Sequence, residues 1–388
     1  MKIIRRWIAF LTVLAGPLLL FSLAQTSGKT AARGQYLAYV GTYTTKTSSK
    51  GIYAFRFDTT TGQLSSIGIA AETPDPSWVV VHPSGKYAYA ANEAGKASTV
   101  SAFAVDAKSG KLTQLNQMPA LGEDPCHLSF DKTGKYLFVA NYSSGTIAVF
   151  PILADGRLGE HTAVMKDQGA TGPNKDRQEA PHAHWIETSP DNRFALVADL
   201  GLDEVLVYKF DATNGTLTPN EPEFAKLKAG SGPRHAAFYL NGKSVFAVSE
   251  LSSTATSFAY EGKKGTLKEI GTASTLPPGF SGRNDVAEVA VHPNGKFLYV
   301  SNRGNDSIAI FSIDPGSRTL APVGEIPTGG KEPRHFAIDP SGKFLLAENQ
   351  HSNNIVVFKI DAATGGLTPT GQVVDVPSPV DLTFVPVE

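Results

Sequence analysis

Side chains able to do acid–base and electrostatic chemistry recur at two places in a phrase that repeats along this 388-residue chain. The first position lies at the start of a short apolar segment, and the second lies at the end of the next segment along the chain. Residues at the first place are His127, His182, His184, Arg234, His235, Glu288, Arg334 and His335; residues at the second are Asn92, Glu93, Asn141, Tyr142, Asp199, Glu250, Asn302, Arg303, Asn349 and Gln350. Imidazoles and carboxylates can exchange protons, and guanidiniums can bind an oxyanion or an anionic group.

The repeated phrase reads as a tight turn, a buried strand and a polar end. It occurs as HPNGKFLYVSN at 292–302 and in variant form at 82–92, 131–141, 189–199, 239–249 and 339–349. A segment such as 307–314 follows each copy, and then an Asp-x-x-x-Gly turn leads to a further segment. Those last segments start at Gln63, Lys111, Arg157, Thr216, Thr266, Thr319 and Gly366. Seven units of about 50 residues, with four β-rich segments in each, indicate an all-β fold, a seven-bladed β-propeller with antiparallel blades.

The two ends of the repeat array predict how the ring closes. The first unit opens at 36–41 with no innermost strand before it, and the chain finishes at 378–386 with one innermost strand and nothing after it. Three N-terminal strands and one C-terminal strand therefore form one blade, which removes the open sheet edges. Residues 35–388 are accordingly expected to form a single domain.

Chain direction sorts the polar residues by face. The innermost strand of each blade runs from one face to the other and the next strand returns, so both polar places lie on one face near the central axis. This face is the mouth, where a dense mixture of His, Arg and carboxylate is the default site hypothesis. The turns with His82 and His292 lie on the opposite face and are interpreted as structural, as is His161 on an outer strand. The insertion at 166–180 is expected to lie over the mouth as a lid.

Composition bounds the remaining possibilities. The net charge is −1 and the chain has no run of basic residues, so it lacks the clustered positive charge by which nucleic-acid-binding proteins are recognised. One cysteine, Cys126, rules out an internal disulfide and is interpreted as a buried thiol. Basic residues 2–6, an apolar run at 7–23 and a small-x-small site at 22–24 predict a signal peptide over 1–24 and a linker over 25–34. We therefore expect export to the periplasm or medium, a monomer, and no stable membrane association after cleavage; an uncleaved anchor is the alternative.

Several phrases resemble the seven-bladed lactonase family, which includes bacterial propeller-type 6-phosphogluconolactonases and fungal carboxymuconate cyclases. The resemblance spans nearly the whole chain after residue 34 and rests on YVGTY, GIYAFRFD, PHAH, DLGLD, GPRH, SNRG and EPRH, at 39–43, 51–58, 181–184, 199–203, 232–235, 301–304 and 332–335. It implies a sugar lactone substrate. It also implies catalytic roles for four residues that match positions proposed for catalysis in the fungal cyclases: His184, Arg234, Glu250 and Arg303.

Lactone opening needs a base for water, a cation for the oxyanion and an acid for the leaving alkoxide. His184 and Glu250 are both candidates for base or acid, and Arg234 and Arg303 for the cation. Predicted substrate-binding residues are His127, Asn141, His182, Asp199, His235, Arg283, Glu288, Asn302, Arg334 and His335. Arginines 234, 283, 303 and 334 are candidates for a phosphate, although a signal peptide argues against a phosphorylated sugar.

Three other interpretations remain open. A muconate-type cycloisomerase would use the same residues for ring closure, and a non-catalytic propeller would bind a ligand or protein at the mouth. A ring of structural ion pairs would hold the blades in register. The sequence has no G-x-S-x-G elbow, no H-E-x-x-H motif and no cysteine cluster for zinc, so no cofactor or metal is predicted. A calcium ion on the propeller axis is the one metal alternative.

Overall fold

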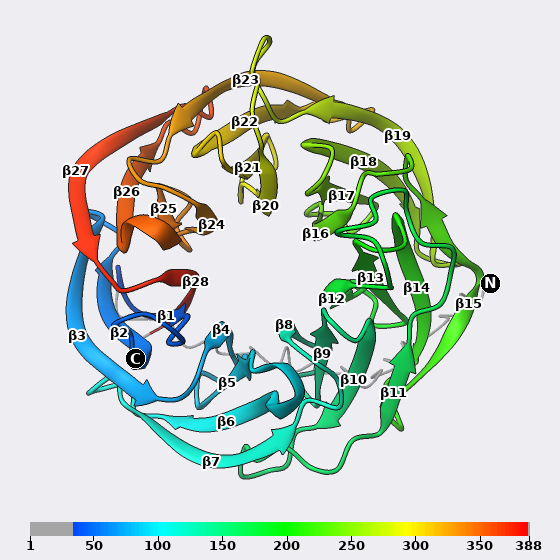
Figure 1. Ribbon diagram of the computed structural model, residues 1–388. Coiled ribbons are helices and arrows are strands. Elements are labelled where there is room, and N and C mark those ends of the chain that lie inside the picture. Colours follow the sequence, from blue (N-terminus) through cyan, green and yellow to red (C-terminus); the bar gives the residue numbers. More distant parts are fainter. Residues whose placement is uncertain (1–33, 387–388) are drawn as a thin grey trace, which may run out of the picture. The chain divides into compact units, whose positions relative to one another are not determined.

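The computed structural model describes residues 34–386, which form seven four-stranded antiparallel sheets around a central axis (Figure 1). Blade 1 holds β28 (Pro379–Pro386), β1 (Gln35–Thr42), β2 (Gly51–Asp58) and β3 (Gln63–Glu72). Blade 2 holds β4 (Pro76–Val81), β5 (Tyr87–Asn92), β6 (Thr99–Val105) and β7 (Leu112–Pro119). Blade 3 holds β8 (Pro125–Phe130), β9 (Tyr136–Asn141), β10 (Thr146–Pro151) and β11 (Ala163–Lys166). The predicted signal peptide and nearly all of the predicted linker lie outside the described residues.

Four further blades complete the ring. Blade 4 holds β12 (Ala183–Thr188), β13 (Phe194–Asp199), β14 (Glu204–Asp211) and β15 (Thr216–Lys226), and blade 5 holds β16 (Pro233–Phe238), β17 (Ser244–Ser249), β18 (Thr254–Glu261) and β19 (Thr266–Ser274). Blade 6 holds β20 (Asp285–Val291), β21 (Phe297–Arg303), β22 (Ser307–Ile313) and β23 (Leu320–Pro327), and blade 7 holds β24 (Pro333–Ile338), β25 (Phe344–Asn349), β26 (Asn354–Ile360) and β27 (Leu367–Asp375). Two 3₁₀ turns, η1 (Gly95–Ala97) and η2 (Gln350–Ser352), follow β5 and β25. Within residues 34–386 no helix is long and apolar enough to cross a membrane.

The ring closes as the chain ends predict. Strand β28 pairs antiparallel with β1, with Tyr39 opposite Thr383, so the C-terminal strand is the innermost strand of the blade formed by the N-terminal strands (Figure 1). Aromatic and branched side chains of neighbouring blades pack into a continuous series of clusters, such as Phe57 against Phe344 at 6.0 Å between ring centroids. Burial of these faces between every pair of adjacent blades stabilises the ring.

One predicted strand start is wrong. The outer strand of blade 3 begins at Ala163 and not at Arg157. The main chain of Leu158 is instead bound by Asn116 of β7, whose amide donates to the Leu158 carbonyl at 2.8 Å and accepts from its N–H at 3.0 Å. This contact with blade 2 keeps Leu158 out of the blade 3 ladder, apart from an isolated bridge to Ile152.

The turns on the face opposite the mouth connect neighbouring blades. His82 Nε2 lies 2.9 Å from the carbonyl oxygen of Gly134, and His292 Nε2 lies 2.8 Å from that of Gly342, each in the equivalent turn of the next blade. Gly134 and Gly342 have φ of 72° and 71°, a conformation that favours glycine in these turns. The two histidines are therefore structural, as predicted.

Candidate active site

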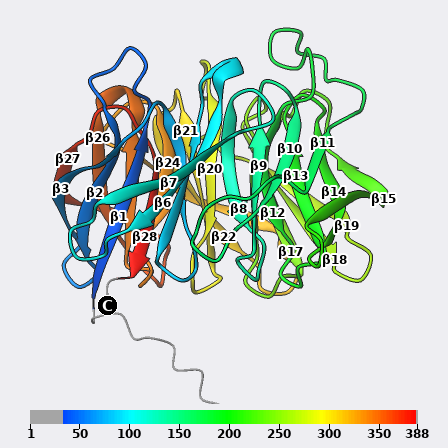
Figure 2. The same ribbon diagram turned by 90° about the horizontal axis from the view of Figure 1, so that it is seen from below.

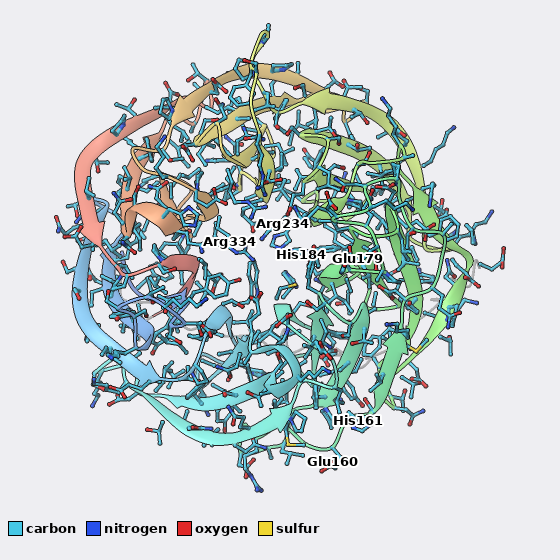
Figure 3. All side chains as sticks on the ribbon, in the orientation of Figure 1. Glu160, His161, Glu179, His184, Arg234 and Arg334 are labelled. Carbon is cyan, nitrogen blue, oxygen red and sulfur yellow. The ribbon has the colours of Figure 1, made fainter. Side chains whose placement is uncertain are left out.

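A β-bulge at the start of each innermost strand aims side chains at the channel. In β8, β12, β16 and β24 the register with the next strand shifts around one extra residue, namely Cys126, His184, Arg234 and Arg334. A bulge breaks the two-residue alternation, so the extra residue and its successor can both face the axis. Figure 3 shows His184, Arg234 and Arg334 around the centre of the ring, whereas His161 lies at its outer rim.

A second ring of mouth residues comes one position after the second strand of each blade. Its members are Tyr43, Glu93, Tyr142, Leu200, Glu250, Arg303 and Gln350. In blade 6 the strand itself extends through Arg303. The extra residues of the innermost strands, which we call the bulge ring, and this second ring together line the mouth. The loops after β1 and β11 lie on the same face (Figure 2).

Glu250 is the centre of the mouth cluster. Its Oε2 lies 2.7 Å from Arg303 Nη2 and 3.2 Å from Arg234 Nε, and its Oε1 lies 2.5 Å from Arg177 Nη2. The side chains of Glu250, Arg234 and Arg303 are at most 8% exposed. Burial by itself would raise the pKa of Glu250, but Arg303, Arg234 and Arg177 outweigh it and lower that pKa to about 2. Glu250 is therefore held as a carboxylate, with both of its oxygens paired to guanidiniums.

The loop between β11 and β12 supplies Arg177, which the sequence reasoning did not single out. The loop is tied down on blade 4, where the Gln178 amide donates to Leu200 O at 2.9 Å and to Asp203 Oδ1 at 2.7 Å. Arg177 also lies 3.4 Å from the Tyr142 hydroxyl and 3.9 Å from Asp285 Oδ1. The predicted lid thus reaches the mouth and completes the ion-pair cluster. No sequence pattern identified Arg177, because loop residues do not follow the two-residue periodicity of a strand.

Arg334 belongs to a separate polar group on the other side of the mouth. Its Nη2 donates to the Tyr43 hydroxyl at 3.0 Å, and Tyr43 donates to Glu93 Oε2 at 2.7 Å. Burial opposes the charge, but Tyr43 and Glu93 raise the pKa of Arg334, which stays a cation. Burial, Arg303 and Arg334 together lower the pKa of Arg234 to about 9, so Arg234 is still charged at neutral pH.

His184 is a buried neutral imidazole beside these cations. Burial, followed by the fields of Arg234 and Arg334, lowers its pKa well below the usual value. Its Nδ1 lies 3.6 Å from Cys126 Sγ, and its ring centroid lies 5.4 Å from that of Tyr142. Burial raises the pKa of Cys126, which keeps the thiol protonated and unsuited to nucleophilic attack.

Four predicted substrate-binding residues lie one layer below the mouth. His127, His235, Glu288 and His335 follow the bulged positions and gather around Trp78 on the axis. The Trp78 ring is 4.5 Å from that of His127 and 5.3 Å from those of His235 and His335, although these residues come from blades 2, 3, 5 and 7. His235 Nδ1 lies 2.8 Å from Glu288 Oε2, and His335 Nδ1 lies 2.8 Å from Glu348 Oε2. We call this the axial layer; it forms the floor of the mouth.

Burial shapes the protonation of the axial layer. It lowers the pKa of His127 to about 3 and that of His235 well below its usual value. It raises the pKa of Asp381 to about 7 and also raises the pKa values of Glu288 and Glu348. For the groups named here, burial favours the uncharged form, which makes it less costly for them to share one buried site. Within residues 34–386 no three His, Cys, Asp or Glu side chains are arranged to hold a metal ion.

Asn141, Asn302 and Asp199 do not line the mouth as predicted, because their side chains are fully buried in the blades. The Asn302 amide donates to Thr275 O at 3.0 Å, and the Asn141 amide donates to Ala120 O at 3.1 Å. Asp199 Oδ1 accepts from the N–H groups of His182 and Leu202, each at 2.9 Å. The asparagines bind the connection that enters their blade, so the residue after each asparagine, and not the asparagine itself, reaches the mouth.

We expect Asn302→Ala to destabilise the protein without affecting its activity. The change leaves the buried Thr275 carbonyl without the Asn302 amide as its donor, and it removes the Oδ1 acceptor of the Thr275 hydroxyl at 2.8 Å and of the Asn284 amide at 3.1 Å. Loss of such buried bonds should lower the free energy of unfolding by about 1–3 kcal/mol, measured by urea denaturation. Asn305→Ala, at a partly exposed position nearby, is the control and should cost less than about 1 kcal/mol. A fall in turnover with unchanged stability for Asn302→Ala would show that Asn302 acts in the mouth and not in the blade.

Two further predicted residues lie at the margin of the cluster. The side chain of Arg283 is 81% exposed and pairs with Asp285 at 2.8 Å. His182 stacks on Tyr142 at 4.5 Å, and its Nε2 lies 3.2 Å from Glu179 Oε1. Neither side chain contacts Glu250 directly. Arg283 is a rim residue, and His182 supports Tyr142.

The fold defines this protein as a seven-bladed β-propeller, and comparison with known proteins identifies its family. The model of the family "Lactonase, 7-bladed beta-propeller" matches residues 37–384. The chain belongs to this lactonase family.

Named relatives agree with this assignment. The chain is 37% identical over 302 residues to a 6-phosphogluconolactonase of Bacillus subtilis, covering 78% of this chain and 84% of that protein. A putative 6-phosphogluconolactonase from Bacteroides fragilis superposes with a TM-score of 0.85 at 38% identity, covering 91% and 98% of the two chains. The periplasmic gluconolactonase PpgL of Pseudomonas aeruginosa superposes with a TM-score of 0.86 at 35% identity, covering 91% and 100%.

Proposed function

We propose that this protein hydrolyses sugar 1,5-lactones in the mouth, with His184 as the general base and the mouth arginines as the oxyanion site. The observation that carries the proposal is the position of a neutral imidazole, His184, on the bulge ring beside Arg234, above a floor closed by the axial layer. Relatives named as lactonases supply the reaction class. The signal-peptide pattern in residues 1–24 supports export, with a substrate outside the cytosol.

The proposed reaction needs one proton shuttle. The Cys126 thiol has the carbonyl oxygens of Ala183 and His184 within 3.7 Å, so its S–H is directed to a carbonyl and Nδ1–H of His184 can point to the sulfur. That tautomer leaves Nε2 of His184 free to accept a proton from water. Water attacks the lactone carbonyl, a guanidinium stabilises the oxyanion, and the imidazolium returns the proton to the ring oxygen as the acyl C–O bond breaks. Glu250 positions Arg234 and Arg303 in this scheme.

The charges of the mouth favour a lactone without phosphate. Arg234, Arg303 and Arg177 are already paired with Glu250, and Arg283 is paired with Asp285 at the rim. Arg334 is engaged by Tyr43. Carboxylates already balance the charge of Arg177, Arg234, Arg303 and Arg283, so a phosphate dianion would gain less from these arginines than from unpaired ones, whereas the hydroxyl groups of a neutral sugar need no excess positive charge.

A pH-stat assay of the purified protein tests both parts of the proposal. We expect glucono-1,5-lactone to be hydrolysed with kcat/KM of at least about 10⁴ M⁻¹s⁻¹, the lower end for typical enzymes. The value for 6-phosphoglucono-1,5-lactone should be no higher. Hydrolysis of neither lactone above the spontaneous rate would end the lactonase proposal, and a clear preference for the phosphorylated lactone would end the charge argument alone.

A further inference from the structure

The mouth continues into a groove that the proposed reaction does not use. The groove has a volume of about 890 Å³ and runs over blades 7, 1 and 2, between the loop after β1 and the turn η2. Its lining includes Tyr43, Thr47, Ser48, Glu93, His351 and Ser378. We call it the side groove. It lies across the mouth from Arg177 and its loop, so the mouth is covered on one side and open on the other.

The side groove is joined to the mouth cluster at two points. Tyr43 and Glu93 line the groove and also bind Arg334 through the Tyr43 hydroxyl. On the other wall the N–H of Gln350 donates to Glu332 O at 3.0 Å, and the Glu332 carboxylate lies 3.9 Å from Arg303. The groove therefore begins one side chain away from Arg334 and from Arg303, at Tyr43 and at the Glu332–Gln350 wall.

Both walls of the groove are held in place by hydrogen bonds within the chain. Asp75, which is buried, accepts from the N–H groups of Thr44 and Thr45 at 2.6 and 2.8 Å and from both of their hydroxyls. On the opposite wall, His351 N–H donates to Lys331 O at 3.2 Å, and Lys331 N–H donates to Ser352 Oγ at 2.7 Å. A preformed groove loses little conformational entropy when it binds.

The size and lining of the groove indicate which class of ligand it binds. A volume of about 890 Å³ is near the upper end of the range of roughly 300–1,000 Å³ for small-molecule sites, and one six-membered lactone ring fills only part of it. The lining is rich in hydroxyl, amide and carboxylate groups and carries two aromatic rings, those of Tyr43 and His351, a mixture that matches the alternating hydroxyl groups and C–H faces of a sugar. A long apolar ligand would find few partners there.

We propose that the side groove binds a second sugar ring, so that the substrate class is a glycosylated aldonolactone, a disaccharide whose reducing end is the lactone. This inference rests on the proposed lactonase function. The lactone ring would lie at the arginines and His184, and the attached sugar would lie along Tyr43 and Glu93 toward Ser48 and His351. Hydrolysis adds water across the acyl C–O bond of the lactone and leaves the glycosidic bond intact. Remote contacts of this kind raise kcat/KM when they help to position the reacting ring.

The test compares glucono-1,5-lactone with maltobiono-1,5-lactone and melibiono-1,5-lactone, which carry the second sugar at O4 and O6, by pH-stat on the full protein. We expect kcat/KM for one of the disaccharide lactones to exceed that for gluconolactone by about tenfold, which corresponds to about 1.4 kcal/mol. Ser48→Trp and His351→Trp, both at exposed positions in the groove, should remove this preference and leave gluconolactone hydrolysis unchanged.

Ser65→Trp is the matched control, because it places the same side chain on the exposed outer strand β3 of the same blade. It should retain the disaccharide preference. Equal kcat/KM for the monosaccharide and both disaccharide lactones in the wild type, or a preference that survives both groove variants, would overturn the side-groove inference while gluconolactone turnover still supports the lactonase. If gluconolactone is not hydrolysed either, the proposed function fails and this inference fails with it.

Discussion

His184→Gln is expected to lower kcat for lactone hydrolysis by about 10²–10⁴-fold while KM changes little. Glutamine approximates the size of the imidazole but cannot take a proton from water and return it to the leaving oxygen, which is the contribution of a general acid–base group. The measurement is steady-state kinetics on glucono-1,5-lactone with the spontaneous rate subtracted. His127→Gln, which also removes a buried imidazole but from the axial layer, should stay within about tenfold of wild type. Equal losses in the two variants would show that packing, and not proton transfer, explains the effect.

The pH profile gives an independent test of the same residue. A base acts in its neutral form, and burial with Arg234 and Arg334 holds the pKa of His184 well below its usual value of 6.5. The base therefore stays neutral as the pH falls through 6.5, and wild-type kcat/KM should be flat from pH 8 to pH 6. A fall in kcat/KM with a midpoint near 6.5 would mean that the acting base is an ordinary, solvated histidine.

Glu250→Gln should lower both stability and activity. The change keeps the shape of the side chain but leaves the buried guanidiniums of Arg234 and Arg303 without their counter-ion. Breaking a buried ion pair in this way typically costs about 3–5 kcal/mol of unfolding free energy. We also expect kcat/KM to fall by at least about 10²-fold, because the two guanidiniums lose the group that positions them.

Urea denaturation and steady-state kinetics on the same preparations measure the two effects. Glu332→Gln is the matched control, since Glu332 is 26% exposed and lies 3.9 Å from Arg303. It should cost less than about 1 kcal/mol. If Glu250→Gln is as stable and active as wild type, the cluster around Glu250 has no role in the reaction. Full activity with a large stability loss would make the cluster a structural ring that holds the blades in register.

The sequence by itself determined the architecture, because the blade pattern is local and repeats seven times. Each copy of the turn-and-strand phrase specifies a hydrophobic strand bounded by turn residues, and the incomplete first and last units specify how the ring closes. Chain direction then identified the mouth face. His184, Arg234, Glu250 and Arg303 were predicted to lie near one another there, and the ion pairs of Glu250 with Arg234 and Arg303 place three of them in direct contact.

Only the tertiary structure decided which polar residues reach the mouth and at what depth. A strand alternates its side chains every residue, so a one-residue bulge changes which of two neighbours faces the axis, and no period in the sequence reveals the bulge. A bulge is why Arg234 and His235 both face the axis, with His235 one layer below Arg234. Asn302 and Arg303 pair regularly with Val286 and Asp285, so the ordinary alternation of β21 places Asn302 in the blade and Arg303 in the mouth. Arg177 and the side groove come from loops, whose positions depend on contacts such as those of Gln178 and Asp75 with residues distant in the chain.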